Sequence, residues 1–154
     1  MNALLSIKPE FGEKILAGEK QYEFRRTTFS DANSIDFIYL YASSPVMQII
    51  GGFTYNRIIE ASPDELWELF GDQSGIEDQD RFMDYYEGAE TGYAIEINTT
   101  YPLQKPITPT EIFEDFVPPV SFFYPGPEMD AVLRTYFPES VETEMTQLPQ
   151  FSSD

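Results

Sequence analysis

Short hydrophobic runs and segments of helical periodicity alternate along the chain, and polar or proline-containing turns separate them. Runs of this length that alternate in polarity, or are continuously apolar, predict β-strands. We expect six strands, at residues 3–7, 21–25, 35–42, 48–55, 92–97 and 120–124, with 57–60 either continuing the fourth or forming another. Gly51 and Gly52 within the fourth strand predict a bulge or a tight barrel corner.

Helices fill the intervals between these strands. Residues 9–17, 78–87 and 128–137 carry apolar side chains at helical spacing. Ser62 and Thr108 are each followed by Pro and, three residues on, by Glu, which predicts a capping box at the start of a further helix. Short strands with helices inserted between them predict an α+β fold built on a small barrel of about six strands.

The chain length of 154 residues fits one domain with a terminal appendage. We expect the domain at residues 1–124 and an extension at 125–154, in which the amphipathic helix 128–137 precedes an acidic tail. No apolar run is long enough to span a membrane, and the short run at 3–7 is not a signal peptide. We therefore expect a cytoplasmic protein that does not bind membranes.

The chain contains neither Cys nor His. Disulfides, thiolate catalysis and histidine-based acid–base chemistry are therefore excluded, and proton transfer would have to use Asp, Glu, Lys or Tyr. The acidic residues between 72 and 84 lack the spacing of a calcium loop, so we predict no metal site and no cofactor.

The net charge of −18 is unevenly placed. Residues 1–57 carry six basic and six acidic side chains, whereas residues 58–154 carry three basic and 21 acidic ones. Duplex DNA is an unlikely partner, because phosphate binding depends on Lys and Arg. A small site in the balanced first third is allowed, since charges are screened over about 8 Å at physiological salt.

A motif in that first third resembles the signature of ASCH domains, which belong to the PUA-like superfamily. The signature is a Gly, any residue, a Lys, two residues, a Glu, any residue and an Arg, and it is met by Gly18, Lys20, Glu23 and Arg25. Further segments in the family's order extend the resemblance over about residues 3–124, at 5–9, 39–45, 59–68, 74–76, 93–95 and 118–122.

The resemblance implies a PUA-like barrel with a cleft beside its first helix. Members bind RNA or modified nucleosides; some deacylate N4-acetylcytidine, and others have been reported as ribonucleases. In the deacylating members the Lys of the motif is catalytic and partners a Thr, whose place is taken here by Glu23. Lys20 thus carries over while the hydroxyl nucleophile does not, so whether this chain is an enzyme stays open.

Strand alternation places Glu23 and Arg25 on one face, opposite Tyr22 and Phe24. We predict Lys20 and Glu23 as an acid–base pair. The predicted substrate-binding side chains are Lys8, Arg25 and Arg26 for phosphate or a base carbonyl, Tyr41 for stacking, and Ser43 and Ser44 for a base edge. The simpler interpretation of the charged residues is a cross-strand salt bridge, and that of the serines is a turn.

Two functions of different class follow. The leading hypothesis is an ASCH-type domain that binds a nucleotide, a modified nucleoside or a short single-stranded RNA in a small cleft, with hydrolysis left open. The alternative is that the acidic part of the chain is an interaction surface, or a nucleic-acid mimic, that regulates a basic protein partner.

Overall fold

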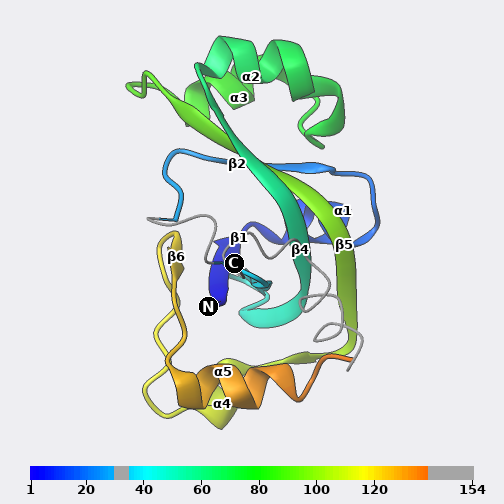
Figure 1. Cartoon of the computed structure of the whole chain (residues 1–154), viewed down its shortest axis with the longest axis vertical. Helices are drawn as coiled ribbons and strands as arrows, with labels where there is room; N and C mark the ends of the chain where they lie inside the picture. The colour runs from blue at the N-terminus through cyan, green and yellow to red at the C-terminus, as the bar shows by residue number, and fades with distance from the viewer. Residues whose placement is uncertain (30–34, 139–154) are drawn as a thin grey trace, which may run out of the picture.

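A single curled sheet of six strands organises the molecule, as the computed structural model, which describes residues 1–29 and 35–138, shows (Figure 1). The strands lie in the order β2-β5-β4-β3-β1-β6, and only β1 and β3 pair in parallel. Their bounds are β1 Ala3–Ile7, β2 Tyr22–Arg25, β3 Ile38–Ala42, β4 Gln48–Ala61, β5 Gly92–Ile107 and β6 Phe122–Phe123. The predicted α+β fold with a small six-stranded barrel is confirmed.

The two longest strands, β4 and β5, bend through the whole height of the molecule (Figure 1). Their pairing shifts register at three places, one of them between Ile49 and Gly51, where a bulge was predicted. Gly52 lies directly against the Phe37 ring, because a Cβ at position 52 would come within 2.4 Å of it. These irregularities let the sheet curl toward a barrel.

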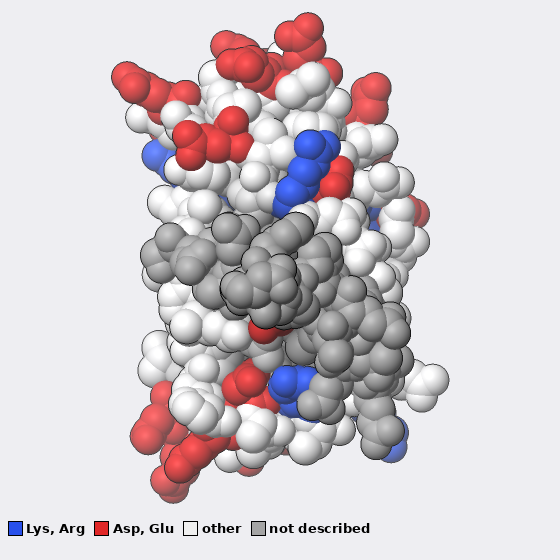
Figure 2. Space-filling view, viewed as in Figure 1, with Lys and Arg blue, Asp and Glu red and all other residues white. Residues whose placement is uncertain are grey.

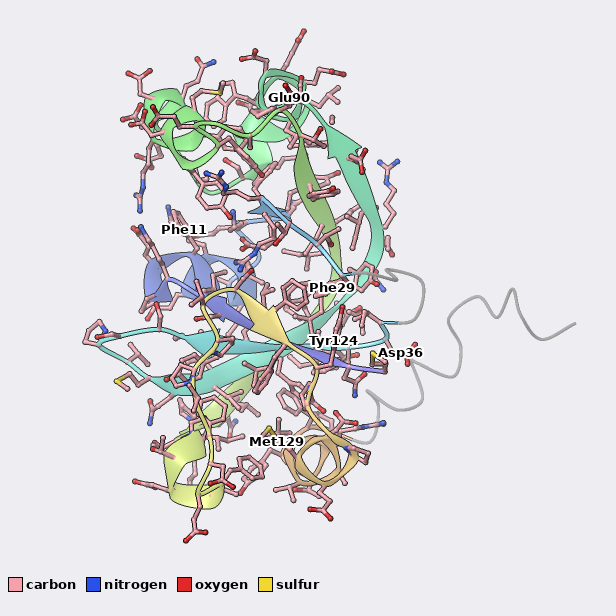
Figure 3. All side chains as sticks on the ribbon, turned by 90° about the vertical axis from the view of Figure 1, so that its left-hand side faces the viewer. Phe11, Phe29, Asp36, Glu90, Tyr124 and Met129 are labelled. Atoms are coloured by element: carbon pink, nitrogen blue, oxygen red, sulfur yellow. The ribbon has the colours of Figure 1, made fainter. Side chains whose placement is uncertain are left out.

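Helices cover the two ends and one side of this sheet, which gives three tiers (Figure 3). In the middle tier α1 (Pro9–Leu16) packs on the central core through Ile15. In the upper tier α2 (Pro63–Phe70), the 3₁₀ turn η2 (Gly71–Gln73) and α3 (Gln79–Tyr85) surround Leu66 and Phe82. In the lower tier α4 (Pro109–Ile112) and α5 (Pro127–Arg134) enclose a separate aromatic cluster.

Apart from shifts in the bounds of several elements, the structure differs from the sequence prediction at β5 and at Thr108. The strand expected at 92–97 continues to Ile107, although Pro102 and Pro106 lie within it. Ser62 caps α2 as expected, with its Oγ accepting from the Glu65 backbone N–H at 3.3 Å. Thr108 makes no such cap, because its hydroxyl instead accepts from the Gln48 side chain at 3.1 Å.

Helix α5 packs into the domain. Leu133 is fully buried, and Phe137 contacts the rings of Phe37 and Tyr39. The Tyr39 hydroxyl donates to the Asp130 carboxylate at 2.6 Å, which ties α5 to β3. The described part of the proposed extension therefore completes the lower core, and the acidic tail that was predicted after it lies outside the described residues.

Candidate functional site

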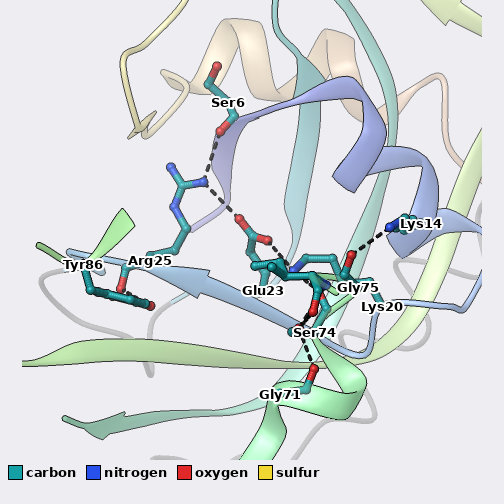
Figure 4. A network of polar contacts seen from close by, with 10 residues as sticks. Ser6, Lys14, Lys20, Glu23, Arg25, Gly71, Ser74, Gly75 and Tyr86 are labelled. Carbon is teal, nitrogen blue, oxygen red and sulfur yellow. Dashed lines mark hydrogen bonds and ion pairs between the residues drawn. The ribbon is translucent and has the colours of Figure 1, made fainter. Parts of the chain in front are cut away.

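The two ends of the curled sheet meet at a seam, where the guanidinium of Arg25 on β2 faces Ser6 of β1 (Figure 4). The same guanidinium also reaches Ser121, just before β6. One of its terminal nitrogens donates to the Ser6 carbonyl at 3.2 Å. The other donates to the Ser121 carbonyl at 3.2 Å and to the Ser121 hydroxyl at 2.8 Å. Arg25 thus joins strands that share no backbone ladder, and it closes the barrel with a side chain.

Glu23 connects Arg25 to Lys20 within the same network. One carboxylate oxygen lies 3.0 Å from the Arg25 guanidinium, and the other lies 3.5 Å from Lys20 Nζ. Glu23 is 4% exposed and Lys20 only 2% exposed. The three charged residues of the sequence motif therefore lie together in one network, inside the protein rather than on an open wall.

Aromatic rings and a backbone carbonyl enclose the Lys20 ammonium group. Its Nζ lies 5.2 Å from the centroid of Phe11 on α1 and 5.2 Å from that of Phe24 on β2. It also donates a hydrogen bond to the carbonyl of Ser74, in the segment between η2 and α3. Burial lowers the pKa of Lys20 from its ordinary value of 10.5, and the neighbouring Glu23 carboxylate opposes that shift.

This arrangement provides the elements of acid–base chemistry. An ammonium group whose pKa is lowered gives up its proton more readily, and a carboxylate 3.5 Å away is placed to accept one. Arg25 adds a planar donor that suits a phosphate or a carbonyl. Its Nε is buried and has no hydrogen-bond partner in the part of the chain that the structure describes.

The other predicted site residues divide into two groups. Lys8 is exposed at the end of β1, and Ser43 and Ser44 follow the parallel strand β3. These three residues therefore lie together beyond the carboxyl ends of the two strands. The Ser43 backbone N–H donates to the Ile7 carbonyl at 2.9 Å. Lys8 is two residues along the chain from Ser6, whose carbonyl accepts a hydrogen bond from Arg25.

Arg26 and Tyr41 lie away from the network. Arg26 donates to the carbonyls of Tyr85 and Glu87 at 3.0 and 3.1 Å, so it ties β2 to the end of α3. Tyr41 is 2% exposed and packs in the lower core against Phe116. A base cannot stack on a ring buried in this way, so the position of Tyr41 corrects that prediction.

Three serines in the network were not singled out from the sequence: Ser6, Ser74 and Ser121. All three lie in segments that carry the family resemblance, 5–9, 74–76 and 118–122, and that membership was the signal available for them. Ser6 binds Arg25 and Ser74 binds Lys20 through backbone carbonyls, which leave no trace in residue identity.

A cleft of about 550 Å³ opens beside the site, between α1 and the segment that follows α2. Its lining is formed by Lys14, Glu19, Trp67, Gly71, Asp72, Gly75, Ile76 and Glu77. Gly75 also contacts the network from this side, since a Cβ there would lie 3.2 Å from the Lys20 Cβ. The backbone of the Ser74–Gly75 segment thus separates this cleft from Lys20.

Charge is unevenly distributed over the surface, with acidic side chains at both ends of the face shown in Figure 2 and basic ones nearer its middle. Among residues 1–29 and 35–138, no cluster of carboxylates could hold a metal ion. None of the helices in that part of the chain is long and apolar enough to cross a membrane. A basic protein partner stays a prediction.

The protein is similar in sequence to a curated protein of Zymomonas mobilis named ASCH domain-containing ribonuclease. The two are 33% identical over 122 residues, which is 77% of this chain and 80% of the relative. The chain belongs to the ASCH domain family. No family model matches it.

Solved structures agree with this assignment. The crystal structure of ASCH from Zymomonas mobilis has a TM-score of 0.79 and 31% sequence identity, and covers 89% of this chain and 96% of its own. A crystal structure of a serine-to-alanine variant of that protein matches with the same TM-score, 30% identity and the same shares of the two chains. The ASCH resemblance of the sequence motif is therefore confirmed, and the PUA-like fold with it.

Proposed function

We propose that this ASCH protein binds a short single-stranded RNA across the barrel seam and cleaves one of its phosphodiester bonds there. The observation that carries the proposal is the convergence of Lys20, Glu23 and Arg25 in one network at the seam. The name of the Zymomonas mobilis relative, a ribonuclease, gives the class of substrate.

The chemistry assigns one role to each charged group. Glu23 accepts the proton of the ribose 2′-hydroxyl, whose oxygen attacks the adjacent phosphorus. The bond from phosphorus to the 5′-oxygen of the next nucleotide breaks, and Lys20 gives that oxygen a proton, leaving a 2′,3′-cyclic phosphate. The Nε–H of Arg25, which has no partner among the described residues, is the donor left for a non-bridging oxygen, and the hydrogen bond from its guanidinium to Ser121 fixes its orientation.

The surface next to the seam suits one or two nucleotides rather than a duplex. Lys8 lies two residues beyond Ser6, a distance of about 7 Å along an extended chain. Lys8 and Ser44 are exposed there and offer a charge and a hydroxyl to the substrate. The acidic ends of the molecule repel longer polyanions, which favours a short strand (Figure 2).

The test is cleavage of a 5′-labelled oligoribonucleotide of mixed sequence, with products separated by size and the 2′,3′-cyclic end identified by mass. Glu23→Gln and Lys20→Met should abolish cleavage, whereas Lys105→Gln, on the exposed outer part of β5, should leave it unchanged. An oligodeoxyribonucleotide, which lacks the 2′-hydroxyl, should not be cleaved.

Two results would overturn the proposal. One is RNA cleavage that survives in Glu23→Gln, which would assign the activity elsewhere. The other is an intact oligoribonucleotide together with release of acetate from N4-acetylcytidine, which would place this chain with the deacylating members of the family.

A further inference from the structure

Lys20 and Glu23 are almost inaccessible in this structure, so a substrate can reach them only if something moves. We infer that residues 71–76, called the strap below, form a lid over Lys20 that opens outward into the neighbouring cleft. This inference rests on the proposed function, because it assigns Lys20 a role that needs contact with a substrate.

On its inner side the strap is held by three hydrogen bonds from outside the segment. Lys20 Nζ donates to the Ser74 carbonyl, and Lys14 Nζ donates to the next carbonyl, that of Gly75, at 2.7 Å (Figure 4). The Gln21 backbone N–H donates to the Gln73 carbonyl at 2.9 Å. Two lysine side chains and one backbone group thus keep the strap closed.

The Ser74 side chain braces the strap from within. Its hydroxyl donates to the Gly71 carbonyl at 2.7 Å and accepts from the Ile76 backbone N–H at 3.0 Å. These bonds fold the segment into a compact turn whose next residue, Gly75, has a φ of +74°. Glycine adopts that conformation without strain. The turn presents the Ser74 carbonyl to Lys20.

The outer side of the strap faces open space. Gly71, Gly75 and Ile76 line the cleft of about 550 Å³, so the strap faces solvent there, and the Ile76 side chain is its contact with the upper core. The polar partners of the Lys20 ammonium are the Ser74 carbonyl and the Glu23 carboxylate. A substrate oxygen that approaches Lys20 from the side of the cleft while Glu23 stays in place would take the position of the Ser74 carbonyl.

The experiment measures access to Lys20 directly, with an amine-reactive acylating reagent and peptide mass spectrometry, on the full chain without RNA. In the wild type Lys20 should react much more slowly than the exposed Lys105. The lowered pKa of Lys20 would by itself speed acylation, because the neutral amine is the reactive form. Slow acylation of Lys20 therefore shows that the strap covers the amine, and is not explained by protonation of the amine.

Ser74→Ala removes the hydroxyl that braces the strap but keeps the backbone carbonyl, and it should raise the Lys20 rate about tenfold, as expected for the loss of one or two hydrogen bonds. Lys14→Met removes the hydrogen bond to the neighbouring Gly75 carbonyl and should act in the same direction. Ser62→Ala, which removes a side-chain hydrogen bond at the start of α2, is the matched control. The Lys105 rate should be the same in all variants.

Two outcomes would contradict the inference that the strap is a lid over Lys20. One is a wild-type Lys20 that reacts as fast as Lys105. The other is that neither Ser74→Ala nor Lys14→Met raises the Lys20 rate above that of Ser62→Ala. The proposed function is tested separately, because a protein with the expected labelling pattern and no RNA cleavage would retain the strap and lose only the ribonuclease role.

Discussion

Removal of the Arg25 guanidinium should open the barrel seam. The substitution Arg25→Met keeps most of the aliphatic stem but deletes four hydrogen bonds, to Glu23, Ser6 and both acceptors of Ser121. The Glu23 carboxylate, whose side chain is 6% exposed, then keeps only Lys20 as a charged partner. Removing one partner of a buried ion pair costs about 3–5 kcal/mol in the free energy of unfolding. Because Glu23 keeps its contact with Lys20, we expect a loss at the lower limit of that range, about 3 kcal/mol.

Urea unfolding followed by the fluorescence of Trp67, the single tryptophan, measures this loss. For a chain of this size about 3 kcal/mol corresponds to a fall in Tm of about 6–12 °C. Arg26→Met is the matched control, because Arg26 is the neighbouring arginine and its two hydrogen bonds are exposed. Its loss should stay within about 1 kcal/mol.

The double variant Glu23→Gln with Arg25→Met tests how far the three charges depend on one another. It should be less stable than Arg25→Met alone, because the glutamine removes the remaining charged partner of the buried Lys20 ammonium. If Arg25→Met costs no more stability than Arg26→Met, the sheet holds its curl without the guanidinium and the role given to Arg25 is wrong.

Three further predictions concern the buried lysine, the bulge and α5. Burial lowers the pKa of Lys20 in the folded protein, so between that pKa and 10.5 the unfolded chain binds the extra proton and this group's contribution to stability rises with pH. Lys20→Met should lack that rise when urea unfolding is compared at several alkaline pH values, and parallel curves would contradict it. Gly52→Ala should cost at least about 2 kcal/mol because its Cβ meets the Phe37 ring, whereas Gly126→Ala, with open space around it, should be close to neutral in thermal unfolding. Leu133→Ala, at a fully buried position of α5, should lower the free energy of unfolding by about 2–5 kcal/mol, and Val132→Ala, at a half-exposed position, by under about 1 kcal/mol. Equal losses in the two variants would contradict the packing of α5 into the core.

Local patterns predicted most of the fold. Alternation identified β2, and Ser62 followed by Pro63 identified the start of α2. The second half of β5 was not predicted, because Pro102 and Pro106 are typical strand breakers. Pro102 is tolerated because it lies opposite Gly51, where the ladder between β4 and β5 is already irregular.

The site was only partly predictable, because its closure depends on contacts between distant parts of the chain. The motif brought Lys20, Glu23 and Arg25 together, and strand parity placed the last two on one face. The burial of Lys20 depends on Ser74, 54 residues away, and the seam depends on Ser121, 96 residues from Arg25. No local pattern encodes such pairings, which arise only when the sheet has curled.

The sheet ends at β2 and β6, which in the described part of the chain are four and two residues long. Such short strands expose few free backbone donors and acceptors, so a foreign strand finds almost no template on which to add at β2 or β6. Edge-to-edge association of copies through these two strands is disfavoured for the same reason.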